Sequence, residues 1–149
     1  MKRLVTLVVL GSLVLSGCGT ITTKELTVTW MKDAQHDRVY KSLHHDIAKT
    51  VRYLKDPTST RADLHTLCSV LNLEIHAAND HLPTPDREAT NLLADGYDQL
   101  ATATTQCDVA GADPVARAKA IATFRKGFGG LYFGTLRLYK VLGRPGSPK

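Results

Sequence analysis

The side chains of this chain that are best suited to metal or haem chemistry are six histidines, His36, His44, His45, His65, His76 and His81. Imidazole is a common protein ligand for zinc and for haem iron. Residues three or four positions apart share a face of a helix. His76 and Asp80 have this spacing, and so do Asp33 and His36. A metal- or haem-binding helical bundle is therefore one hypothesis for the function.

No stronger catalytic or metal-binding motif accompanies these histidines. The sequence contains no His-Glu-x-x-His, no Glu-x-x-His, no Cys-x-x-Cys-His and no Gly-x-Ser-x-Gly, which are the motifs that zinc, di-iron, covalent haem and serine-nucleophile sites use. Asp95 and Asp98 fall on the outward side of an expected helix, where carboxylates keep a protein soluble. Only His36 lies on an apolar stripe. We therefore predict no enzyme activity, no catalytic residue, no metal ligand and no cofactor.

The glycine-rich segment 127–134, with the sequence GFGGLYFG, needs a different explanation. A phosphate-binding loop follows a strand and opens a helix, whereas this segment lies inside a helical pattern. On a helical wheel, Gly130 and Gly134 point away from the apolar stripe, which predicts a groove for a partner helix or an anionic polymer. The alternative is that the glycines permit close packing within the fold or break the helix. The candidate partner-binding residues are Lys119, Lys126, Gly130, Phe133, Gly134 and Arg137.

The N-terminal segment has the pattern of an export signal. Two basic residues precede a run of twelve mostly apolar residues, which spans about 18 Å as a helix and is too short to cross a bilayer. Leu15-Ser16-Gly17-Cys18 ends this run and resembles the lipobox of bacterial lipoproteins. The resemblance implies cleavage after Gly17 and lipidation of Cys18, so that the mature protein is anchored outside the cytoplasm of a bacterium. The alternative is an ordinary signal peptide with an incidental cysteine.

Composition and cysteine count agree with an exported domain. Removal of residues 1–17 leaves 132 residues, enough for one domain with a core. Cys68 and Cys107 remain after Cys18 is lipidated, and an even pair outside the cytoplasm predicts a disulfide. Residues 18–113 carry nine Lys/Arg and fourteen Asp/Glu (−5), whereas residues 114–149 carry eight Lys/Arg and no acid (+8). The basic part suits an anionic lipid, a cell-envelope polymer or an acidic protein face, and export disfavours nucleic acid.

Four amphipathic segments follow a predicted lipidated tether at residues 18–32. Their apolar residues recur every three or four positions, the period of a helix. The expected core stripes are Val39, Leu43, Ile47, Val51 and Leu54; Leu64, Leu67, Cys68, Leu71, Ile75 and Ala78; Ala89, Leu93, Tyr97, Leu100, Thr104 and Cys107; and Ala118, Ile121, Phe128, Tyr132 and Tyr139. This pattern predicts an all-α, up-down-up-down four-helix bundle at residues 33–143 and a disordered tail at 144–149.

Local signals place the helix ends. Asp56-Pro57 ends the first segment, Thr60 begins the second through a capping box, Thr84 caps the third, and Asp113 caps the fourth. In a simple hairpin, however, Cys68 and Cys107 are misaligned by roughly 10 Å, which exceeds the reach of a disulfide. Two explanations are open: a kink of the third helix at Gly96, or a first turn of the third helix that does not pair with the second helix.

The mature domain also has a loose resemblance to a group of proteins. The order of Cys68, the turn Pro83-Thr84-Pro85-Asp86 and Cys107 resembles uncharacterised helical lipoproteins of high-GC Gram-positive bacteria. That resemblance implies no specific activity. The sequence therefore predicts a lipid-anchored, non-enzymatic binding module.

Overall fold

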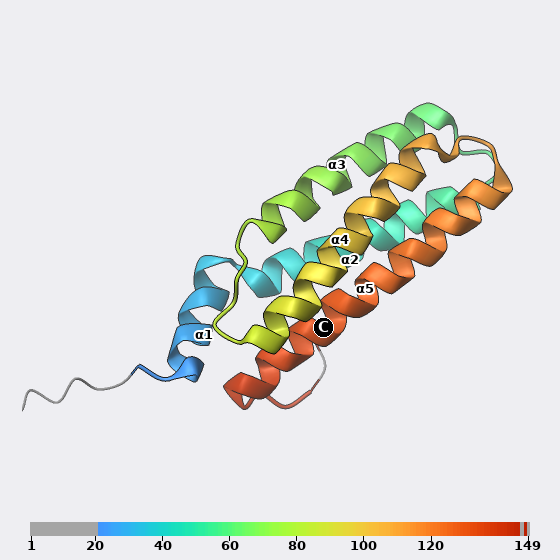
Figure 1. Ribbon diagram of the computed structural model, residues 1–149. Helices are drawn as coiled ribbons and strands as arrows, with labels where there is room; N and C mark the ends of the chain where they lie inside the picture. Colours follow the sequence, from blue (N-terminus) through green and yellow to red (C-terminus); the bar gives the residue numbers. More distant parts are fainter. Residues whose placement is uncertain (1–20, 147, 149) are drawn as a thin grey trace, which may run out of the picture.

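The computed structural model describes residues 21–146 and 148, which form five α-helices. They are α1 (Thr23–Asp33), α2 (His36–Lys55), α3 (Arg61–Asn79), α4 (Arg87–Ala110) and α5 (Pro114–Leu142). The four long helices α2–α5 lie side by side and alternate in direction, while α1 packs at the end where α4 begins and α5 ends (Figure 1). The predicted all-α bundle is confirmed, with one additional helix. The predicted signal peptide (1–17) and Cys18 lie outside the described residues.

Most helix ends follow the local signals. The Thr60 hydroxyl accepts from the Asp63 backbone N–H in a capping box, and Asp113 caps α5 with Pro114 as the first helical residue. Thr84 does not cap α4 as predicted. Asp86 does, accepting from the Ala89 N–H at 2.8 Å, because an aspartate is at least as good a cap and its carboxylate faces the positive end of the helix dipole.

The core stripes predicted for α2, α3 and α4 are confirmed. Every residue of the stripe on α4 is buried, and the α2 and α3 stripes are buried or half-buried. The core stripe predicted for α5 is wrong: the buried face is displaced from it by about one residue position around the helix. The buried side chains of that helix include Ala120, Phe124, Leu131 and Leu138, whereas the predicted aromatic residues are only half-buried beside this core.

The predicted tether at 18–32 is wrong for residues 23–32, which belong to α1. Thr22 and Glu25 form a capping box that begins this helix. Thr27 and Met31 are the buried residues of α1. The Trp30 indole N–H also donates to the His81 carbonyl at 2.7 Å. The buried Thr27 hydroxyl donates to the Thr23 carbonyl, so this polar side chain is buried without losing its hydrogen bond.

A disulfide joins Cys68 on α3 to Cys107 on α4, with Cα atoms 6.1 Å apart, as predicted. Gly96 is not needed to explain the alignment. Helix rise places Cys68 about 17 Å before the end of α3 and Cys107 about 30 Å after the start of α4. The connection at 80–86 covers the difference because it continues along the bundle axis rather than turning back at once (Figure 1).

Two further features concern the membrane and the C-terminal end. Within residues 21–146, no helix combines the length and the apolar character that a bilayer crossing requires. The disordered tail predicted at 144–149 is wrong for Arg144, whose backbone N–H donates to the Tyr139 carbonyl and whose guanidinium pairs with Asp37 at 3.2 Å. Residues 147 and 149 lie outside the described part of the chain.

Candidate functional site

Two of the predicted partner-binding residues lie inside the bundle. A Cβ atom at Gly130 would lie 2.8 Å from the Gly96 Cα on α4, and one at Gly134 would lie 2.6 Å from the Leu93 Cγ. These glycines allow the backbones of α4 and α5 to approach closely, which was the alternative interpretation of the segment. The prediction that Gly130 and Gly134 face a partner is wrong, because the wheel treated the aromatic residues as the core face.

Of the other predicted residues, Arg137 is half-buried and the remaining three are exposed on α5. Lys119, Lys126 and Phe133 are exposed, and Lys140 continues their seven-residue spacing. Seven helical residues rise about 10.5 Å and return to nearly the same side of the helix. These four residues, here called the α5 stripe, therefore run about 32 Å along one side of the bundle. Lys140 was missed by the sequence analysis, although its spacing from Phe133 was a usable signal.

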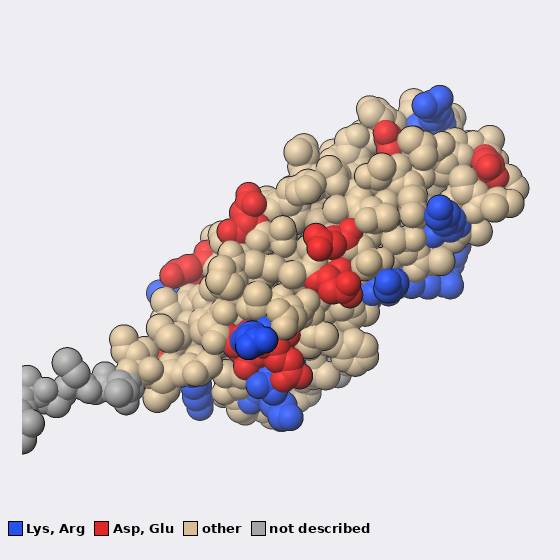
Figure 2. Space-filling view, in the orientation of Figure 1, with Lys and Arg blue, Asp and Glu red and all other residues tan. Residues whose placement is uncertain are grey.

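Charge is unevenly distributed on the face shown in Figure 2. Asp and Glu lie near the middle, where α4 runs, Lys and Arg border the N-terminal half of α5, and both signs mix at the end nearest α1. Residues 114–149 contain no acidic residue. The α5 stripe therefore has the charge to contact an anionic partner.

A surface depression of about 580 Å³ adjoins the C-terminal half of the α5 stripe. Its apolar part consists of Leu92, Phe133 and Leu136, and Phe133 is 57% exposed. Polar atoms come mainly from the charged lining residues Glu88, Arg137, Lys140 and Arg144. This arrangement can hold a ligand that has both an apolar part and an anionic group.

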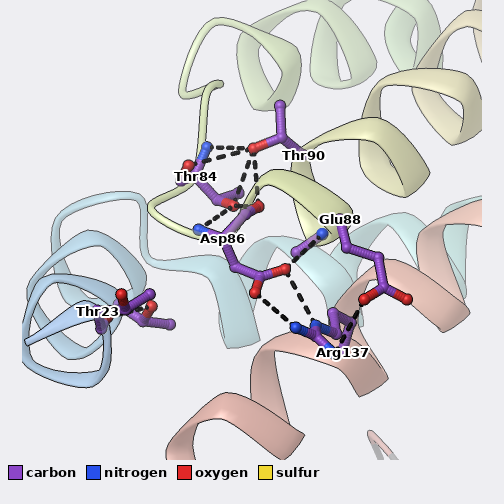
Figure 3. Close-up of polar contacts among 8 residues, drawn as sticks. Thr23, Thr84, Asp86, Glu88, Thr90 and Arg137 are labelled. Atoms are coloured by element: carbon purple, nitrogen blue, oxygen red, sulfur yellow. Dashed lines mark hydrogen bonds and ion pairs between the residues drawn. The ribbon is translucent and has the colours of Figure 1, made fainter.

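Arg137 is held by the start of α4. Its guanidinium donates to both carboxylate oxygens of Asp86, at 3.1 and 2.9 Å, and pairs with Glu88 at 2.9 Å (Figure 3). The hydrogen bond from Arg137 lowers the pKa of Asp86 below its ordinary value. Arg137 therefore fixes α5 to the N-terminal cap of α4, and its charge is already compensated at the depression.

Among the described residues, Lys140 is the lining cation of this depression for which no ion pair is seen. Arg144 pairs with Asp37 and lies over the Tyr139 ring, 5.6 Å from the centroid. Within the described part of the chain, no carboxylate oxygen lies within 4.0 Å of the Lys140 ammonium. An anionic group entering the depression would therefore meet Lys140 without displacing an existing partner.

The histidines do not gather into a site. His36 is buried against Thr135, His44 stacks on Phe128 with ring centroids 4.9 Å apart, and the His65 imidazole pairs with Asp108. His45, His76 and His81 are exposed. Over residues 21–146, no three His, Cys, Asp or Glu side chains come together as a metal ion would require.

An acidic pair lies between α2 and α3. Burial, followed by the neighbouring Asp46 carboxylate, raises the pKa of Glu74 above its ordinary value. Glu74 also borders a depression of about 360 Å³ that Arg38 and His81 help to line. Two carboxylates supply too few ligands for a divalent cation, so this pair does not define a metal site.

Comparisons with protein-family models, with curated proteins and with solved structures give no significant match to this chain. The candidate site consequently rests on the geometry of the α5 stripe and its depression.

Proposed function

We propose that the chain is an exported, lipid-anchored bacterial protein that acts as a non-enzymatic binding module, with the α5 stripe as its binding surface. The observation that carries this proposal is the stripe itself: three lysines and an exposed phenylalanine in register on a helix without acidic residues. The export signal and Cys18 supply the location. The partner is an acidic protein face or an anionic envelope component, because cations at this spacing favour extended negative charge.

The proposal has two separable parts, the anchor and the surface. The anchor is tested by mass spectrometry of the mature N-terminus, which should begin at Cys18 and carry a diacylglyceryl thioether. A mature chain that begins elsewhere, or that carries no lipid, would overturn this part.

The surface is tested by photo-cross-linking from Gly129 in cells that produce the full chain. A Cβ at Gly129 meets no atom within 4 Å, so a photoreactive side chain fits there without disturbing the bundle. We expect one dominant adduct, lost in the K119E/K126E/K140E variant. The control K24E/K32E/K41E has the same change in net charge on exposed residues of α1 and α2, and should keep the adduct. No adduct, or equal loss in both variants, would contradict the α5 stripe as a binding surface.

A further inference from the structure

The structure places the apolar depression at the end of the bundle that the lipid anchor must approach. Helix α1 begins at Thr23, five residues after Cys18. Five extended residues reach at most about 18 Å. A lipidated Cys18 would therefore hold the start of α1 close to the bilayer. A flexible tether reaching to residue 32 would have allowed the bundle to lie much farther from the bilayer.

The depression lies at this same end. Helix α1, the start of α4 and the end of α5 meet there (Figure 1), and Thr23 lies at the same end as Asp86 and Arg137 in Figure 3. Lys140 is two residues before the last residue of α5. Apolar side chains are also exposed on or next to α1, namely Ile21, Leu26 and Val28. Aromatic and apolar side chains next to cations suit the interface between headgroups and acyl chains.

We propose that this depression binds an anionic phospholipid of the membrane that holds the anchor. This inference rests on the proposed function and names the partner at the membrane end of the α5 stripe. The phosphate would meet Lys140, which pairs with no carboxylate of residues 21–146, and the glycerol and upper acyl region would contact Leu92, Phe133 and Leu136. The bundle would then stand on its α1 end, with Lys119 and Lys126 farther from the membrane and free for another partner.

The test uses the full lipidated chain reconstituted into phosphatidylcholine vesicles with or without phosphatidylglycerol. A photoreactive phenylalanine analogue replaces Phe133, and a control carries it at Val115. Val115 is 76% exposed but lies in the first turn of α5, at the opposite end of the bundle. We expect at least fivefold more phosphatidylglycerol adduct from position 133 than from position 115. The Lys140→Glu variant should reduce that adduct severalfold, and omission of phosphatidylglycerol should leave little lipid adduct.

Three results would overturn the inference: no lipid adduct from position 133, equal adducts from positions 133 and 115, or equal labelling of phosphatidylcholine and phosphatidylglycerol. Its failure is distinguishable from failure of the proposed function. A protein adduct from Gly129 in cells, with no lipid adduct from position 133 in vesicles, would retain the binding module and reject the lipid. An unlipidated Cys18 would reject both the anchor and this inference.

Discussion

At the scale of single residues, His36 shows how burial sets protonation. The Thr135 hydroxyl donates to the Leu131 carbonyl at 2.8 Å, so the His36 Nε2–H donates to that hydroxyl at 3.0 Å. The ring also lies 5.3 Å from Trp30 between centroids. Burial lowers the pKa of His36 from 6.5 to about 4. The histidine is therefore a neutral hydrogen-bond donor that joins α2 to α5, which makes it unsuitable as an accessible metal ligand.

This depressed pKa predicts a specific dependence of stability on pH. Between pH 6.5 and about 4, the unfolded chain binds a proton at His36 that the folded chain does not, so the free energy of unfolding falls as pH falls. The full loss is on the order of 3 kcal/mol. We expect His36→Gln to reduce this slope in urea unfolding measured from pH 7 to pH 4. The exposed control His76→Gln should leave the slope unchanged, and equal slopes in wild type and His36→Gln would refute the assignment.

At the scale of elements, glycines let α4 and α5 approach closely, and the α4 side chains Leu93 and Leu100 pack directly against Gly134 and Gly127 of α5. Gly96 and Gly127 also belong to this interface, since a Cβ on either would lie within 3.0 Å of the facing helix. An adjacent glycine, Gly129, meets no such neighbour. Gly129 and Gly130, which are consecutive residues of α5, therefore have opposite structural roles.

The contrast gives a matched pair of substitutions. Gly130→Ala inserts a methyl group against backbone atoms of α4 and should lower the free energy of unfolding by about 1–3 kcal/mol. Gly129→Ala adds helix propensity in open space and should raise it by up to about 1 kcal/mol. Chemical denaturation followed by circular dichroism measures both. If both alanines stabilised the protein, α4 and α5 could not be packed as closely as the structure shows.

The elements also show where sequence reasoning succeeds. On α2, α3 and α4, large aliphatic residues mark the core at helical spacing, so the stripes are readable. On α5 the buried face contains glycine, alanine and threonine, which carry little hydrophobic signal. The half-buried aromatic residues therefore placed the predicted core face too far toward α2. Lys119, Lys126 and Phe133 are accordingly exposed as expected, and their role in binding stays a prediction, whereas Gly130 and Gly134 face α4. Helix α1 was missed because its threonines outweighed the Thr22–Glu25 capping box.

At the scale of the whole molecule, the two ends of the bundle are fixed by different chemistry. At the end far from α1, the buried Arg117 guanidinium donates to the carbonyls of Gly111, Asp56 and Ser59, joining two interhelical loops. At the α1 end, Arg137 and His36 connect α5 to its neighbours. The disulfide lies between these ends, on the face where α3 packs against α4.

The disulfide closes a loop with a sequence separation of 39 residues, and it should act mainly on the unfolded chain. The chain-entropy relation gives a stabilisation of roughly 4 kcal/mol for a loop of this length. We expect Cys68→Ser/Cys107→Ser to lose about that much free energy of unfolding while retaining its helical circular dichroism, because Leu64 and Leu71 of α3 and Leu100 of α4 also belong to the hydrophobic core. Wild type in reductant should match the double variant in urea denaturation. A much smaller loss of free energy of unfolding, in the double variant and in reduced wild type alike, would mean that packing alone holds α3 in place. It would also mean that the unfolded chain is already compact without the disulfide.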